Sequence, residues 1–136
     1  NVIDSFSNGI INFHPGVLPE NRGLDNLKWA IYNNLPQGVT THLIDENIDV
    51  GQQIYKEYID LDLEDTIFDV NSKIFDLQMM HLDRLLKENF NIKHLESLKS
   101  KYKSQKAVSD QIDNEIFNNF ENYKNKYSKI LELYSK

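Results

Sequence analysis

Short stretches typical of strands alternate along this chain with longer stretches typical of helices. The strand-like runs, which are apolar or β-branched and bounded by polar or turn-forming residues, are residues 9–14, 39–44 and 53–59. The helix-like stretches, in which apolar residues recur every three or four positions, are residues 26–33, 65–90 and 112–134. This order of elements predicts an α/β fold.

Local signals predict where these elements begin and end. Pro15 lacks a backbone N–H and biases the residue before it toward extended geometry, so the first strand should end there. Residues 15–23 are bracketed by prolines and closed by a glycine, as loops often are. The side chain of Asp25 or Asn26 should cap the first helix, and the carboxylate of Asp65 should cap the second.

The second helix is expected to turn one apolar face inward and to fray out by Phe90. The residues of that face are Ile67, Val70, Ile74, Leu77, Leu82, Leu85 and Leu86. Residues 93–109 are basic and polar, which predicts a connection with a short helical piece over residues 94–98. A third amphipathic helix follows, in which Ile112, Ile116, Phe120, Tyr123, Tyr127, Ile130 and Tyr134 form the apolar stripe.

Composition narrows the classes of protein to which the chain can belong. At 136 residues it allows one modest domain, and without cysteine it has no disulfide, thiolate nucleophile or cysteine-based metal site. Residues 1–98 hold 7 Lys/Arg against 16 Asp/Glu, while residues 99–136 hold 8 against 5. Because the acidic body repels phosphate, a nucleic-acid partner is disfavoured.

The sequence carries no membrane signal. It has no apolar run of 18 residues, and its first residues have neither the basic nor the apolar region of a secretory signal. The expected location is therefore the reducing cytoplasm. The four histidines, which are His14, His42, His81 and His94, lack the spacing of metal ligands, so no metal site is expected.

Three polar residues stand where strands give way to loops. Asn12 and His14 are two positions apart on one strand, so their side chains share a face, and Asp49 follows the second strand. An amide and an imidazole can donate hydrogen bonds to a developing oxyanion, and a carboxylate can orient the imidazole. This set suits acyl transfer, although a histidine at the end of a strand is more often structural.

The chain resembles the folate-dependent formyltransferases between residues 9 and 86. The matching motifs, in order, are Ile11-Asn12-Phe13-His14-Pro15-Gly16-Val17-Leu18-Pro19-Glu20-Asn21-Arg22-Gly23, Trp29-Ala30-Ile31, Gly38-Val39-Thr40-Thr41-His42, Asp49-Val50-Gly51-Gln52 and Asp65-Thr66. Members of this family transfer a formyl group from 10-formyltetrahydrofolate to an amine. The resemblance implies that Asn12, His14 and Asp49 are the catalytic residues.

In the implied mechanism, Asn12 and His14 bind the oxyanion, while Asp49 holds His14 and helps to move a proton. The loop before Asp49 would contact the pterin through Asp45, Glu46, Asn47 and Ile48, although the acidic side chains of Asp45 and Glu46 can simply be solvated.

Other polar and aromatic residues of the matched region allow structural as well as functional roles. Arg22 can bind an anionic or hydroxylated part of the substrate, or it can pin its own loop. His42 is expected to be packed and hydrogen-bonded rather than catalytic, and Trp29 is expected in the core.

The residues of two motifs suggest which amine is the substrate. Trp29-Ala30-Ile31-Tyr32-Asn33-Asn34 and the His42 motif look more like formyltransferases of nucleotide-linked amino sugars than those of methionyl-tRNA. Glycinamide ribonucleotide and methionyl-tRNA stay open as alternatives, because Gly16 stands where serine is commoner in the family.

The resemblance implies a three-layer, Rossmann-like domain with a mixed sheet. This chain would supply its later half over residues 1–92, and residues 93–136 would form a helical extension. The first strand would then be an edge that pairs with a missing N-terminal half or with a second copy in a homodimer. The alternative function is therefore an incomplete or split fragment that is inactive alone and acts as an associating or ligand-binding module.

Overall fold

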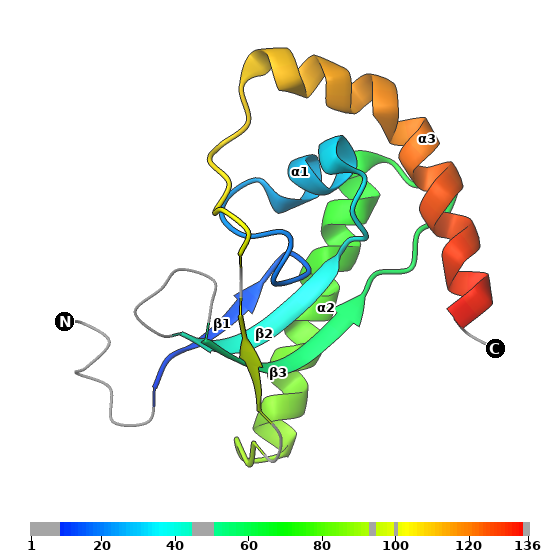
Figure 1. Cartoon of the computed structure of the whole chain (residues 1–136). Coiled ribbons are helices and arrows are strands. Elements are labelled where there is room, and N and C mark those ends of the chain that lie inside the picture. The colour runs from blue at the N-terminus through cyan, green and yellow to red at the C-terminus, as the bar shows by residue number, and fades with distance from the viewer. Residues whose placement is uncertain (1–8, 45–50, 93–94, 100, 135–136) are drawn as a thin grey trace.

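The computed structural model describes residues 9–44, 51–92, 95–99 and 101–134, with side chains through residue 128. It contains four strands and three helices in an α/β arrangement (Figure 1). In chain order these are β1 (Ile11–His14), α1 (Asn26–Asn33), β2 (Gly38–Ile44), β3 (Gly51–Tyr58), α2 (Ile67–Lys87), β4 (Glu96–Leu98) and α3 (Asp110–Tyr134). The three predicted strands and the three long predicted helices are thereby confirmed, with boundaries shifted by a few residues.

The strands form one sheet in the order β1-β2-β3-β4, and every neighbouring pair is antiparallel. In the β1–β2 pair, Asn12 lies opposite His42 and His14 lies opposite Thr40. After β1 the chain forms α1 near the end of the sheet at which β1 finishes. Strand β2 then begins at this same end and runs back beside β1 (Figure 1). The prediction of a mixed sheet is therefore wrong for the described strands. A parallel pair would need a connection that crosses back to the opposite end of the sheet before the next strand begins.

One face of the sheet is covered by α2, which runs along β1 and β2 (Figure 1). The buried Thr41 of β2 and the buried His81 of α2 meet there, with the Thr41 hydroxyl 2.8 Å from His81 Nδ1. The Gln78 amide also donates to the Phe13 carbonyl at 2.6 Å. These polar contacts fix how α2 sits on the sheet in addition to the apolar packing.

The main core lies where α1, the start of α2 and α3 meet the end of the sheet. Its buried members are Leu27, Ala30, Ile31, Val39, Ile59, Leu61, Val70, Ile74, Leu77, Ile116, Phe120, Tyr123 and Tyr127. Two of these, both on α3, also bond to the end of α1, since the Tyr123 hydroxyl donates to the Leu35 carbonyl and the Tyr127 hydroxyl to the Asn34 carbonyl. Helix α3 is thus part of the core.

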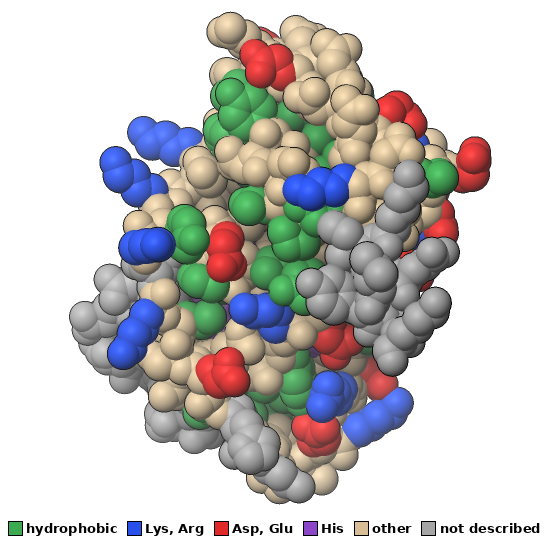
Figure 2. Space-filling model, turned by 45° about the vertical axis from the view of Figure 1, so that its right-hand side comes forward, with side chains coloured by type: hydrophobic (Ala, Val, Ile, Leu, Met, Phe, Trp, Pro, Cys, Tyr) green, Lys and Arg blue, Asp and Glu red, His purple; other side chains and the backbone are tan. Residues whose placement is uncertain are grey.

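Several large apolar side chains stay at the surface. Figure 2 shows apolar side chains exposed among charged ones on one face, and Phe68, Phe75 and Phe117 are each more than half exposed. Leu86 was expected to face inward but is 54% exposed. Its neighbour Leu85 is fully buried, and successive helical residues point about 100° apart, so both cannot face the sheet.

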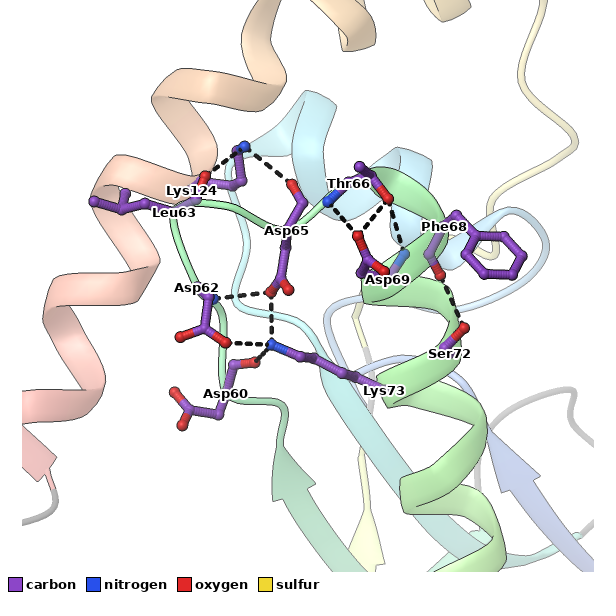
Figure 3. Close-up of polar contacts among 10 residues, drawn as sticks. All are labelled: Asp60, Asp62, Leu63, Asp65, Thr66, Phe68, Asp69, Ser72, Lys73 and Lys124. Carbon is purple, nitrogen blue, oxygen red and sulfur yellow. Dashed lines mark hydrogen bonds and ion pairs between the residues drawn. The ribbon is translucent and has the colours of Figure 1, made fainter.

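The helix caps differ from the prediction. Thr66, rather than Asp65, is the N-cap of α2, and it forms a reciprocal capping box with Asp69 (Figure 3). Asp25 precedes α1 in a left-handed conformation without a side-chain cap, and its carboxylate instead accepts from the Val108 N–H at 2.8 Å. Neither carboxylate caps its helix, because that of Asp25 binds the distant Val108 and that of Asp65 binds Asp62 and Lys73.

Residues 96–98 form a strand rather than part of the predicted helical piece. They pair with residues 51–53 of β3. A five-residue helix gains few internal hydrogen bonds, whereas the edge of β3 offers unpaired backbone groups. Trp29 also differs from its prediction: it is only half-buried, and its indole N–H donates to the Lys106 carbonyl at 2.7 Å.

A network of charged groups ties α3 to the start of α2 (Figure 3). The Lys124 ammonium, buried on α3, donates to the carbonyls of Leu63 at 2.7 Å and Asp65 at 3.0 Å. The Asp65 carboxylate accepts from the Asp62 N–H at 2.8 Å and pairs with Lys73 at 2.7 Å. One short loop therefore satisfies a buried cation from α3 and a cation from α2.

We expect the Lys124→Met variant to lower the free energy of unfolding by about 1–3 kcal/mol. The methionine keeps most of the apolar stem but removes the donor to the carbonyls of Leu63 and Asp65, the second of which is buried. Urea unfolding followed by circular dichroism measures this change. The matched control is Lys126→Met, an exposed lysine on the same helix, which should change stability by less than about 0.5 kcal/mol. Equal effects of the two variants would contradict the anchoring role of Lys124.

Stability should also depend on the protonation of His81. Burial lowers the pKa of His81, and the Glu57 carboxylate at 3.5 Å offsets this only in part. The unfolded histidine therefore binds a proton more readily than the folded one, so the free energy of unfolding falls as the pH drops below about 6.5.

The His81→Asn variant, which keeps a polar group for Thr41, should weaken this loss of stability at acidic pH. Urea unfolding of both proteins across that pH range measures the difference. An identical pH dependence of the two proteins would show that another group causes the loss.

Candidate active site

Asn12 and His14 lie on one face of β1, as their spacing predicts. His14 is buried, with a relative exposure of 3%, whereas Asn12 is half-buried. Their partners across the β1–β2 pair are His42 and Thr40. The His14 and His42 rings lie edge to face, with centroids 6.4 Å apart. The pairing of two strands thus gathers an amide and two imidazoles in one place.

The Asn21 carbonyl indicates which ring nitrogen of His14 carries a hydrogen. His14 Nε2 lies 2.7 Å from the backbone carbonyl oxygen of Asn21. A carbonyl oxygen only accepts hydrogen bonds, so this short contact assigns a hydrogen to Nε2. The Asn26 amide nitrogen, which also only donates, lies farther from Nε2, at 3.2 Å, and with this tautomer does not bond to it. The Asn26 amide donates instead to the Asn21 carbonyl oxygen at 3.1 Å. The ring of His14 is therefore held by the loop that follows β1.

Buried polar groups hold that loop, residues 15–23, against β2. The Thr40 hydroxyl accepts from the Leu18 N–H at 3.0 Å and donates to the Gly16 carbonyl at 2.9 Å. The Gln37 amide donates to the Pro15 carbonyl at 2.8 Å, and the Asn21 amide donates to the Asn26 carbonyl at 2.8 Å. These bonds fix the backbone of the loop relative to the sheet. They therefore also fix the Asn21 carbonyl, which accepts the hydrogen bond from His14.

In this structure Gly16 allows the close approach of its loop to His14. A Cβ atom at residue 16 would lie 2.8 Å from the Asn21 carbonyl oxygen and 2.9 Å from His14 Nε2. Both distances are shorter than real Cβ contacts. The glycine therefore makes room for the hydrogen bond between His14 and Asn21.

His42 is fully buried and hydrogen-bonded. Its Nε2 atom lies 3.2 Å from the Asn12 amide nitrogen, and its Nδ1 atom lies 3.1 Å from the Leu43 carbonyl oxygen. The expectation that His42 is packed and hydrogen-bonded is confirmed.

Arg22 contacts a distant segment of the chain. Its guanidinium donates to the Tyr102 carbonyl at 2.7 Å, and the adjacent Gly23 bridges to Gln105. The Leu24 N–H also donates to the Gln105 carbonyl at 3.0 Å. This favours the structural reading of Arg22, in which it fixes the loop. Its role in substrate binding stays a prediction.

The remaining predicted site residues, Asp49 and the cofactor candidates Asp45, Glu46, Asn47 and Ile48, lie outside the described residues. Their roles stay predictions. The residues that sequence reasoning missed are Thr40, Asn21 and Asn26, which hold the His14 loop. Their polar character in a buried region is visible only after folding, since they come from three separate segments.

The described part of the chain holds no group of three or more His, Asp or Glu side chains that could bind a metal ion. None of its helices is long and apolar enough to cross a membrane. What the site offers is the Asn12 amide and the His14 imidazole on one face of β1. Such a pair can bind an oxyanion and exchange a proton with a substrate.

Comparisons with known proteins agree with the motifs. Among curated proteins, GDP-perosamine N-formyltransferase of Brucella melitensis biotype 1 is 32% identical over 79 residues, covering 57% of this chain and 30% of its own. Methionyl-tRNA and phosphoribosylglycinamide formyltransferases also match. This chain thus spans about a third of the length of the Brucella relative.

Solved structures show the same fold. A 4-N formyltransferase from Francisella tularensis superposes with a TM-score of 0.61 at 27% identity, covering 76% of this chain and 49% of its own. The formyltransferase PseJ from Anoxybacillus kamchatkensis, solved with a UDP-linked formamido sugar and tetrahydrofolate, gives 0.68 at 20% identity, covering 85% and 61%. At that identity the likeness shows the fold alone.

A family match covers most of the chain. Residues 1–86 match the Formyl transferase family, whose formyl donor is a tetrahydrofolate. This region includes β1, the loop that holds His14, β2 and β3. The chain therefore belongs to the formyl transferase family.

Proposed function

We propose that this chain carries the catalytic residues for transfer of a formyl group from 10-formyltetrahydrofolate to an amine. The observation that carries the proposal is the placement of Asn12 and His14 on one face of β1, with His14 held through Nε2 by the Asn21 carbonyl. Family membership supports the same reaction, since formyl transfer is the activity of the relatives. Asp49 is proposed as the third catalytic residue.

In this reaction the amine nitrogen bonds to the formyl carbon and the carbonyl oxygen takes up negative charge. Asn12 donates an amide hydrogen to that oxygen. His14 is the second polar group proposed beside that oxygen, and its ring is held by the hydrogen bond between Nε2 and the Asn21 carbonyl. Asp49 orients His14 and, through water, passes the proton of the amine to the departing folate nitrogen, after which the bond between that nitrogen and the formyl carbon breaks.

We propose a nucleotide-linked amino sugar as the amine substrate. The motifs around Trp29 and His42 support this choice, and so do the sugar N-formyltransferases among the relatives. Methionyl-tRNA is less compatible with the acidic residues 1–98. The folate would lie against residues 45–48, as the resemblance implies.

A second candidate function is association with another polypeptide along β1. Among the described strands, β1 pairs with β2 on one side and has no neighbour on the other. The unpaired backbone groups of such an edge can bind a further strand. In that case the chain contributes Asn12 and His14 to a site that is complete only in the complex.

A substrate panel separates these options. Folate release is measured with the natural gene product and, in parallel, with nucleotide-linked amino sugars, glycinamide ribonucleotide and methionyl-tRNA. We expect turnover with an amino sugar only. Turnover with one of the other amines would contradict the proposed substrate but keep the reaction. No turnover by the isolated chain, followed by turnover after a second polypeptide is added, would favour the association function.

Replacing Asn12 by alanine should lower the turnover number by about 100-fold to 1000-fold, the usual cost of losing one oxyanion donor. The measurement is the rate of folate release at saturating amine and formyl donor. The matched control is Asn125→Ala, since Asn125 is exposed on α3 and its amide donates to the Glu121 carbonyl of the same helix. If Asn12→Ala folds and keeps normal turnover, Asn12 is not the oxyanion donor.

A further inference from the structure

We infer that His42 is a positioning residue that sets the orientation of the Asn12 carboxamide. The inference rests on the proposed function, in which Asn12 donates to the oxyanion. His42 itself is fully buried beneath the site and acts through Asn12.

The Leu43 carbonyl determines the tautomer of His42. Its oxygen lies 3.1 Å from His42 Nδ1 and can only accept a hydrogen bond, so Nδ1 carries the hydrogen. In the neutral imidazole the other nitrogen, Nε2, then carries a lone pair and accepts. The Asn12 amide nitrogen 3.2 Å from Nε2 agrees with this tautomer, because that nitrogen needs an acceptor.

The lone pair of His42 in turn determines which end of the Asn12 amide faces it. Asn12 Nδ2 lies 3.2 Å from His42 Nε2, and an amide nitrogen can only donate. The NH₂ end of Asn12 is therefore turned toward His42, and its oxygen is turned away. One of the two Nδ2 hydrogens is used in this bond, and the second is the donor that the proposed reaction needs.

Strand alternation gives position 42 its place in the site, because successive residues of a strand point to opposite faces of the sheet. Thr41 bonds to His81 under α2, while His42 bonds to Asn12 across the β1–β2 pair. His42 is therefore the residue of β2 that faces Asn12, on the face of the sheet away from α2.

Two substitutions distinguish positioning from simple filling of the core. His42→Leu removes the acceptor, and His42→Gln keeps an acceptor oxygen at about the place of Nε2. For the folded variants of the natural gene product, we expect His42→Leu to lower turnover by about 10-fold to 100-fold, as is typical when an orienting group is lost. His42→Gln should recover most of that loss, with little change in KM for the formyl donor in either variant.

The double variant tests whether the effect passes through Asn12. In the Asn12→Ala background, His42→Leu should cost less than about 3-fold, because the group that it orients is already gone. A full additional loss in that background, or equal turnover of the Leu and Gln variants, would overturn the inference.

A spectroscopic measurement on the unmodified chain gives an independent result. The ¹⁵N chemical shifts of the His42 ring should show Nδ1 protonated and Nε2 unprotonated, with a coupling to the Asn12 side-chain amide. A protonated Nε2 would overturn the inference even if His42→Leu fails to fold. If instead Asn12→Ala keeps normal turnover while the NMR result holds, the proposed reaction is at fault and the hydrogen-bond geometry stands.

Discussion

The antiparallel pairing of β1 with β2 is the constraint on which the site depends. Its register places Asn12 opposite His42 and His14 opposite Thr40. The bond of Asn12 to His42 crosses this pair, and the bond of His14 to Asn21 reaches the loop that joins the pair to α1. A shift of one residue would turn Asn12 and His14 to the face covered by α2, where the contacts of Thr41 and Phe13 are formed.

The rest of the fold supports this pairing from outside. Helix α2 packs on one face of the two strands through Thr41, His81 and Gln78. Helix α3 is joined to the start of α2 by Lys124 and to the end of α1 by Tyr123 and Tyr127. The segment after β4 bonds to Arg22, Leu24 and Trp29. The loop that holds His14 is thus enclosed by elements that follow it in the sequence.

The sequence predicts those features that depend on neighbouring residues. Strand and helix periodicity locates β1, β2, β3 and all three helices, and the two-residue spacing puts Asn12 and His14 on one face. Features that depend on distant residues are not predicted. The strand β4 exists because the edge of β3 is available, and Asp25 bonds to Val108 rather than capping α1.

The same distinction applies to the candidate site. The resemblance identifies its polar residues, but the bonds of His14 to Asn21 and of Asn12 to His42 join residues 7 and 30 positions apart. These contacts, rather than the motif, determine which ring nitrogen and which end of an amide can face a substrate.

The most direct measurement is a titration of the ¹⁵N-labelled natural gene product with 5-formyltetrahydrofolate, a folate that cannot complete the transfer. The account predicts saturable chemical-shift changes at the Asn12 side-chain amide and the His14 ring. The Asn125 amide, on the exposed side of α3, should not change. Binding that leaves Asn12 and His14 unchanged, or no binding at all, would contradict the claim that these residues face the formyl group.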